Sequence, residues 1–485
     1  ESLPAIFPDC CNVTVPYNIA PLNFMLPAEE YTECVARFTT PDGKQQTFGK
    51  GTKVQIPVAE WHKWLEASKD KSLKVEVWGQ KDGKWLSFMP FEIHVSNDPI
   101  DEYVSYRLIE PSYVAWDRME IAQRDVTSFE EKQIFNNEIT CTDRSIGQCI
   151  NCHSYQNYKT DNMLFHVRLS NAGTVIVNDG EISKKNLKRD YTISGGVYPS
   201  WHPTAKVIAF STDITRQAFH TLHPNKIEVY DEASDLILYD IASDSVIVVS
   251  EDPELLEVYP SWSPDGKYLY YCKSAPLPEE MRGFDIRTTF QKVQYNLYRR
   301  TFDESSLSFG EEELVYDAAS VDKSATLPRI SPDGQYLLFA QGQYGCFHIR
   351  HGDSDVMCLP LDRAMSPDVE LAGEGSPALD LTNLNSEGFA DSYPTWSSNG
   401  KWIMCSSRRG DGSFSRLFFS YFSNGKVEKA FMLQQEDPLL FRDLILQHQL
   451  PKFVIFYILH EYLHLYHLFF HLHQRISFYF LLLGL

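Results

Sequence analysis

The chain has 485 residues, which is more than one small domain needs, so two domains followed by a tail are expected. Hydrophobic residues make up 43% and aromatic residues 13% of it, which suffices for packed cores and excludes a disordered protein. The 65 acidic and 44 basic side chains give a net charge of −21, and so acidic a surface repels phosphate backbones and excludes nucleic acid as a partner.

The first hundred residues contain short segments in which apolar and polar residues alternate, as in half-buried strands. The clearest are residues 35–38, 52–56, 74–78 and 91–95. Pro-Asp-Gly (41–43) and Lys-Asp-Gly (81–83) supply turns, and residues 58–69 have a helical pattern. This spacing predicts a small β-sandwich-like domain over residues 1–100, with an adaptor or packing role.

Cys149-Ile-Asn-Cys152-His153 matches the Cys-x-x-Cys-His pattern of c-type haem attachment. In that chemistry two thiols add to the haem vinyl groups and the adjacent histidine binds the iron. Candidates for the second axial ligand are Met163, His166 and His202.

The same cysteines overlay a predicted strand pair, so three alternatives remain open. They are a covalently bound haem c, a disulfide or plain thiols with Cys141 as a further disulfide partner, and a metal site. A haem or a disulfide would place the protein outside the cytoplasm.

Four similar segments further along the chain indicate an internal repeat. They are Tyr198-Pro-Ser-Trp201, Tyr259-Pro-Ser-Trp262, Leu327-Pro-Arg-Ile330 and Tyr393-Pro-Thr-Trp396, and they begin 61, 68 and 66 residues apart. Each leads through a tight turn into a second strand. In these turns proline presets φ, Asp or Asn bonds its own backbone, and glycine takes the positive φ. A second hairpin follows each pair, so each repeat predicts a four-stranded blade.

This repeat resembles that of the TolB-like β-propeller family, whose signature is seen best at residues 259–267. The resemblance covers about residues 100–450 and implies an all-β, six-bladed propeller, with five blades as the alternative. Residues 119–135 and 151–166 would supply the two weaker blades. The expected domains are therefore the sandwich-like domain at 1–100, the propeller at 101–450 and a tail at 451–485.

Two connections between the second and third strands of a blade are long, residues 212–234 and 273–295. Extra length at one face of a rigid ring is typical of a binding surface. The cations in these and the equivalent connections have two interpretations. They form an anion- or carboxylate-binding mouth, or they are ordinary residues of solvated loops. These cations are Arg216, His220, His223, Arg282, Arg287, His348, Arg350, His351, Arg408 and Arg409.

The tail contains His460-Glu-Tyr-Leu-His464, which fits the zinc-protease pattern. Its surroundings are Phe, Leu, Tyr and His with almost no charge, so a chance match is expected. Histidines interrupt every long apolar run, which argues against a membrane span of about 20 residues. Residues 455–485 are therefore expected to be a non-native, poorly ordered end.

The chain begins at Glu1 without an initiator methionine or an apolar signal core, which indicates a processed product whose lipid anchor, if any, lay on a removed leader. Two functions follow from these observations. The resemblance implies a non-enzymatic, exported protein of the periplasm or outer membrane that docks a protein or peptide partner. The alternative is a haem-bearing electron-transfer or sensing protein that uses Cys149, Cys152 and His153.

Overall fold

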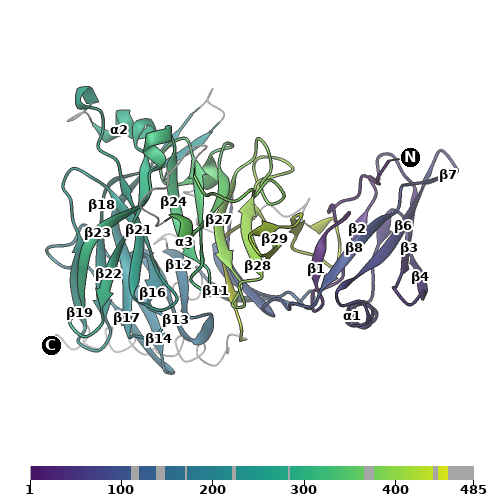
Figure 1. Cartoon of the computed structure of the whole chain (residues 1–485), viewed down its shortest axis with the longest axis horizontal. Coiled ribbons are helices and arrows are strands. Elements are labelled where there is room, and N and C mark those ends of the chain that lie inside the picture. The colour runs from purple at the N-terminus through teal and green to yellow at the C-terminus, as the bar shows by residue number, and fades with distance from the viewer. Residues whose placement is uncertain are drawn as a thin grey trace, which may run out of the picture.

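The computed structural model shows an all-β chain with a few short helices (Figure 1). It describes residues 2–110, 119–137, 148–169, 172–220, 225–281, 285–364, 376–440 and 446–456.

The N-terminal domain is built on one six-stranded sheet. Its strand order is β1-β8-β6-β3-β4, with β7 paired to β6. Asp82 and Gly83 close the β6–β7 hairpin with φ of 51° and 73°, as a type I′ turn requires. The strands are β1 (Thr14–Pro16), β3 (Glu33–Thr39), β4 (Gln45–Phe48), β6 (Lys71–Lys81), β7 (Lys84–Ser87) and β8 (Phe91–Ser96).

One helix, α1 (Val58–Ala67), packs against this sheet. Trp61 and Trp64 are buried on it, and their rings lie 6.3 and 5.8 Å from that of Phe38 on β3. The other strands described here, β2 (Phe24–Met25) and β5 (Lys53–Val54), form only a two-stranded sheet. The large sheet is therefore covered in part by a helix, where a sandwich would place a second sheet of similar size.

The N-terminal domain is joined to the last sheet of the remaining structure through a shared core. Its apolar residues belong to the same buried cluster as those of β28 and β29. Across the junction the Trp402 indole N–H donates to Pro99 O (3.0 Å), the Tyr421 hydroxyl to Asp98 (2.6 Å), and Lys53 pairs with Asp437 (2.8 Å). Figure 1 shows the domain beside β28 and β29.

The rest of the described chain forms six sheets. The first sheet contains β32 (Gln447–Val454), β9 (Tyr103–Ile109), β10 (Glu120–Asp125) and β11 (Glu131–Asn136), and the second contains β12 (Gln148–Gln156), β13 (Lys159–Leu169), β14 (Gly173–Asn178) and β15 (Glu181–Lys185). The third contains β16 (Val197–Trp201), β17 (Val207–Phe219), β18 (Ile227–Asp240) and β19 (Ser245–Ser250), and the fourth contains β20 (Glu257–Trp262), β21 (Tyr268–Ser274), β22 (Tyr295–Asp303) and β23 (Ser308–Tyr316). The fifth contains β24 (Ser324–Ile330), β25 (Tyr336–Gly342) and β26 (Asp355–Pro360), and the sixth contains β27 (Asp391–Trp396), β28 (Trp402–Ser407), β29 (Arg416–Ser423) and β30 (Lys426–Val427), with β31 (Phe431–Met432) paired to β29.

The first strand of each sheet in this order contacts the first strand of the next: β32, β12, β16, β20, β24, β27 and again β32. The sheets therefore follow one another around an axis, as in a β-propeller. Short helices lie in the connections: η1 (Glu279–Met281), α2 (Ile286–Thr289), η2 (Phe290–Lys292), η3 (Ala318–Val321), η4 (His348–Arg350) and α3 (Leu361–Ala364).

The C-terminal strand β32 closes the first sheet. It runs antiparallel to β9, with Gln447 opposite Ile109 and Val454 opposite Tyr103. The boundary expected at residue 451 thus falls inside a paired strand, and residues 451–454 belong with the sheets. The rest of the expected tail, apart from Ile455 and Phe456, lies outside the described residues.

All six innermost strands share a backbone irregularity. Each has one non-glycine residue in the left-handed region, with φ between 48° and 59°, at a point where its register against the neighbouring strand shifts. These residues are Cys152, Tyr198, Tyr259, Leu327, Tyr393 and Leu450. Proline follows in five of the six strands, and His153 in the other. A bulge suits proline because a ladder hydrogen bond is already lost there.

The three repeat tryptophans occupy equivalent, buried positions, as the sequence predicts. Trp201, Trp262 and Trp396 are 5%, 7% and 2% exposed. The Trp262 indole N–H donates to Ser200 O (3.1 Å) and that of Trp396 to Arg329 O (3.2 Å). Both bonds reach the innermost strand of the preceding sheet, so the tryptophans join neighbouring sheets.

Candidate functional site

The connection expected as a long loop at residues 212–234 is a β-hairpin. Strands β17 and β18 stay paired through it, out to Phe219 opposite Ile227. Ile214 and Phe219 on this extension are 39% and 62% exposed. The alternation of β-branched and aromatic residues with polar ones explains why it is a strand pair, and it brings apolar side chains to one face of the molecule.

The equivalent connection of the next sheet, residues 273–295, carries η1, α2 and η2. Asp285 caps α2 by accepting a hydrogen bond from Arg287 N (3.0 Å). Phe290 stacks on Tyr230 of β18, with ring centroids 4.6 Å apart and planes 8° apart. This contact ties the connection to the hairpin at the edge of the sheets marked by α2 in Figure 1.

A groove with a volume of about 640 Å³ lies between these two connections. None of its described lining residues is basic. Its larger apolar lining residues are Ile193, Leu255, Leu256, Leu277, Ile286 and Val293, and its acidic ones are Glu232, Asp235, Asp252 and Glu254. Its volume falls within the range typical of ligand sites.

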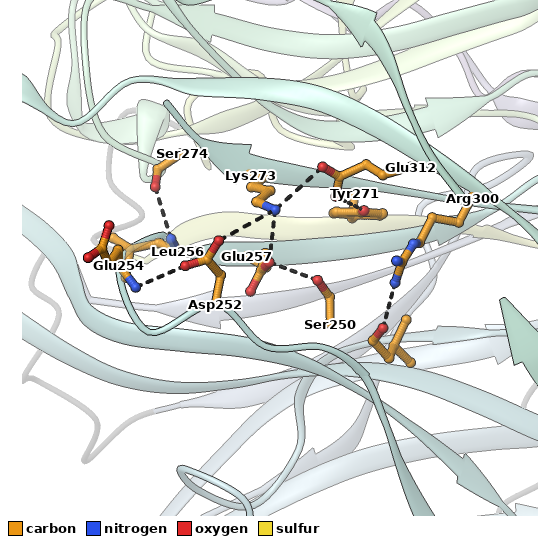
Figure 2. A network of polar contacts seen from close by, with 11 residues as sticks. Ser250, Asp252, Glu254, Leu256, Glu257, Tyr271, Lys273, Ser274, Arg300 and Glu312 are labelled. Atoms are coloured by element: carbon orange, nitrogen blue, oxygen red, sulfur yellow. Dashed lines mark hydrogen bonds and ion pairs between the residues drawn. The ribbon is translucent and has the colours of Figure 1, made fainter. Parts of the chain in front are cut away.

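A cluster of carboxylates surrounds a single ammonium group at one side of the groove (Figure 2). Lys273 Nζ lies 3.4 Å from Glu312, 3.6 Å from Glu257 and 3.9 Å from Asp252. Ser250 donates to the Glu257 carboxylate (2.8 Å). Three carboxylates share one cation, so the cluster stays negative when they are ionised, and Asp252 is its member in the groove lining.

Burial shifts the pKa of two acids toward neutral pH: Glu257 of this cluster and Asp235 of the groove lining. It raises the pKa of Glu257 to about 7, although the Ser250 hydrogen bond and Lys273 lower it. Burial, with smaller contributions from Glu251 and Asp252, also raises the pKa of Asp235 to about 6. The negative charge of the groove lining therefore grows around pH 6, where Asp235 ionises.

A second polar layer is buried beneath the β17–β18 extension. Glu228 accepts hydrogen bonds from the Tyr344 hydroxyl (2.6 Å) and pairs with His351 Nε2 (2.8 Å). Burial raises the Glu228 pKa, but His351 and Tyr344 outweigh it, and the net shift is downward. These contacts fasten the hairpin to the segment that contains η4.

The neighbouring Asp231 accepts from the Thr215 hydroxyl (2.8 Å) and the Cys346 thiol (3.5 Å). Burial and the nearby Asp213 raise its pKa well above the usual value. Burial also raises the pKa of Asp213 to about 6. The protonated form of this carboxyl pair is therefore favoured in the folded chain.

Three arginines proposed for an anion-binding mouth each pair with a different carboxylate. Arg216 pairs with Glu232 (2.9 Å), Arg409 with Asp391 (2.9 Å), and Arg287 with Asp285. His220 lies 6.5 Å from the ring of Phe290. His223 and Arg282 lie outside the described residues.

The other proposed mouth residues are more deeply placed. His348 is buried with Nδ1 3.0 Å from the Thr326 hydroxyl, and His351 is held by Glu228. Arg350 is 7% exposed, and Arg408 donates to Gln447 Oε1 (3.4 Å). Burial, and to a smaller extent the nearby charge of Arg350, lowers the pKa of Arg408 to about 9.

The Cys149–His153 segment lies within β12, where both cysteines are buried, free thiols. Burial raises the pKa of each thiol and lowers that of His153 to about 3. The cavity lined by Cys152 and His153 has a volume of about 30 Å³. That is the space of about one water molecule, so a porphyrin does not fit beside His153.

The candidate axial ligands already serve packing and hydrogen bonding. Met163 belongs to a buried apolar cluster, and His166 Nδ1 lies 3.2 Å from the Thr174 hydroxyl. His202 Nε2 lies 3.1 Å from Gly266 O of the next repeat turn. Cys141, the other candidate disulfide partner, lies outside the described residues.

The described part of the chain holds no group of three or more His, Cys, Asp or Glu side chains that could bind a metal ion. It also holds no helix long and apolar enough to cross a membrane. His460 and His464 of the zinc-protease pattern lie outside the described residues.

No family model matches the chain, and no curated protein matches it in sequence. Among solved structures it is similar to an oligogalacturonate lyase from Vibrio parahaemolyticus, with 12% identity over 68% of this chain and 73% of that one, at a TM-score of 0.36. It is also similar to the β-propeller domain of the Trilobed protease from Pyrococcus furiosus, with 11% identity over 76% and 91%, at a TM-score of 0.35.

A third similar structure is the hydrazine synthase of Kuenenia stuttgartiensis, with 13% identity over 75% of this chain and 94% of that one, at a TM-score of 0.35. The chain has a β-propeller fold. At these identities and TM-scores, the likenesses carry no inference about its activity.

The groove acids were not singled out from the sequence. The segment Glu251-Asp-Pro-Glu-Leu-Leu-Glu257 carries a signal, because four acids flank two leucines directly before an inner strand. The apolar lining could not be found this way, since it comes from three separate connections of the chain.

Proposed function

We propose that this protein is a propeller-based binding protein that docks a basic, partly apolar peptide segment of a protein partner in the groove between the β17–β18 hairpin and residues 273–295. The observation that carries the proposal is the lining of this groove: six large apolar side chains beside four acidic ones and no basic one among its described residues. Complementary charge favours a cationic partner and speeds its encounter.

The surroundings of the groove support a surface for a macromolecule. Phe219 is 62% exposed at the far end of the hairpin, so the hairpin also carries an exposed apolar side chain outside the groove lining. The hairpin is held in place by the Phe290–Tyr230 stack and the Glu228–His351 pair, so little ordering is needed on binding.

The experiment is a fluorescence-anisotropy titration with a labelled peptide of alternating lysine and leucine, against a peptide in which glutamate replaces lysine. We expect the basic peptide to bind and the acidic one not to. Asp235→Asn together with Glu254→Gln removes two groove carboxylates and should weaken binding about tenfold. Glu311→Gln together with Glu92→Gln, at exposed positions on β23 and β8, makes the same change of two charges outside the groove and is the control.

An equal loss of binding in the control with Glu311→Gln and Glu92→Gln would mean that the net charge of the chain, and not the groove carboxylates, causes the effect. Equal affinity for the acidic peptide, or an unchanged affinity in the double variant, would contradict the proposal.

We also propose that the ring has six blades of the TolB-like kind and that the protein is exported to the cell envelope. Support for the count is that six innermost strands share the positive-φ bulge. Support for the location is limited to the repeat resemblance at residues 259–267 and its equivalents. Fractionation of the source cells, with a cytoplasmic enzyme as marker, tests the location.

A further inference from the structure

The innermost strands place one equivalent side chain each along the propeller axis, two residues after the positive-φ position. In four strands this residue carries a hydroxyl: Ser154, Ser200, Ser261 and Thr395. In the other two it is Arg329 on β24 and Lys452 on β32. Two cations therefore stand where the repeat otherwise places small hydroxyl residues.

These side chains meet around one cavity. All six line a space of about 160 Å³, together with Asn157 and several aromatic residues. None of the described residues that line it is acidic. Asp101, close to Tyr158 of the lining, has its carboxylate engaged by the Ser398 backbone N–H (2.7 Å) and hydroxyl.

The two cations lack a compensating charge in this cavity. Arg329 Nη1 donates to Pro328 O (2.7 Å), which uses one of its five N–H donors. Burial lowers the pKa of Arg329 to about 10. It lowers the pKa of Lys452 well below its usual value, and the charge of Arg329 lowers it further. Holding two like charges together at low dielectric costs free energy that a bound anion would relieve.

We propose that this end of the channel binds a small oxyanion, inorganic phosphate or the phosphoryl group of a small molecule, between Arg329 and Lys452. A volume of 160 Å³ corresponds to about five water molecules, which suits an anion of this size. The guanidinium and ammonium groups supply charge-assisted hydrogen bonds, and the hydroxyls of Ser154, Ser200, Ser261 and Thr395 are further donors.

This site is separate from the peptide groove. It is lined by residues at and just before the turns between first and second strands, such as Asn157 and Trp262, whereas the groove is built from connections at the opposite ends of the strands. Its test is independent of the proposed peptide-binding function.

The test is isothermal titration of the whole chain with inorganic phosphate, and separately with glycerol 3-phosphate, at constant ionic strength in sodium chloride. The variants are Arg329→Ser and Lys452→Ser, which install the residue that the equivalent strands carry. Lys267→Ser, whose side chain is 75% exposed on a turn outside the cavity, is the matched control.

We expect each variant to weaken phosphate binding at least about tenfold and the control to leave it unchanged. In phosphate-free buffer both variants should melt at or above the temperature of the unsubstituted chain, because like-charge repulsion is removed, and this also shows that they fold. Tighter binding of glycerol 3-phosphate would identify a phosphoryl group as the ligand, and tighter binding of phosphate the free ion. No binding of either probe at about 10 mM would overturn the proposal. Unchanged binding in a chain that carries both Arg329→Ser and Lys452→Ser would also overturn it.

Discussion

Val454 on β32 lies opposite Tyr103 on β9, so the last described strand of the chain completes the first sheet. The contact joins segments that are far apart in sequence, and it makes the ring depend on residues 447–454. Ile455 N adds a hydrogen bond to Tyr158 O (3.0 Å) at the end of this strand.

A chain that ends at Phe456 should therefore keep its melting temperature within about 2 °C, because it retains the whole closing strand. A chain that ends at residue 446 loses the innermost strand of the first sheet and should melt at least about 10 °C lower or fail to fold. Circular dichroism melting of the two truncations against the full chain measures both. Similar melting of the two truncations would show that the closure contributes little.

Replacing Trp396 by alanine should destabilise the chain by about 3–5 kcal/mol, because it empties a buried position between two sheets. Trp396 packs on Phe422 with ring centroids 4.9 Å apart and donates to Arg329 O. Trp85→Ala, at a side chain that is 51% exposed, should change the free energy of unfolding by less than about 1 kcal/mol. Urea unfolding of both variants measures the difference, and equal losses would contradict a role in joining the sheets.

The repeat could be predicted from the sequence because its turn chemistry is local. In Ser263-Pro-Asp-Gly266 the Asp265 carboxylate accepts from Lys267 N (3.1 Å), and Asp333 and Asn399 do the same in their repeats. The last inner strand was missed because Leu450-Pro-Lys-Phe453 keeps only the proline and the aromatic residue of the motif. Strands β3, β6 and β8 of the N-terminal sheet were predicted from the sequence, whereas β1, β4 and β7 were not. What covers the sheet could not be predicted either, since α1 covers it through tertiary packing of Trp61 and Trp64.

The candidate sites were harder to predict than the fold. Arginine-rich connections suggested an anion-binding mouth, but Glu232, Asp285 and Asp391 pair with three of those arginines. An alignment of the four repeats makes Arg329 stand out, because the other three repeats have a hydroxyl residue at this position. Lys452 carries the same signal only once β32 is recognised as an inner strand.

Protein produced together with cytochrome c maturation machinery should carry no covalent haem, because the cavity beside His153 holds about 30 Å³. The measurement is the visible spectrum of the denatured protein, in which covalently attached haem would persist. Replacing His153 by proline, the residue at this position in five of six inner strands, should leave the fold intact. A haem band that Cys152→Ala abolishes would contradict this expectation.

Glu257→Gln should raise the melting temperature by roughly 2 °C at pH 8 and by much less at pH 5. The folded pKa of Glu257 is about 7, above the usual 4.5 of an unfolded glutamate, because its carboxylate is buried. The folded state therefore binds this proton more tightly than the unfolded state does, and the cost of ionisation grows as pH rises from about 4.5 to 7. Glutamine removes that cost above pH 7, and below pH 5 it replaces a carboxyl that is already neutral.

The control for this prediction is Glu312→Gln, which removes another partner of Lys273 at a site that is 25% exposed. It should not stabilise the chain at pH 8, because its carboxylate accepts a hydrogen bond from the Tyr271 hydroxyl and interacts with Lys273. Calorimetric melting at pH 5 and pH 8 separates the two variants. A lower melting temperature of Glu257→Gln at pH 8 would mean that the Glu257–Lys273 ion pair outweighs the burial of the carboxylate.

The basic peptide should bind more weakly at pH 5 than at pH 8 in either case, because Asp235, with a pKa of about 6, loses its charge in that interval.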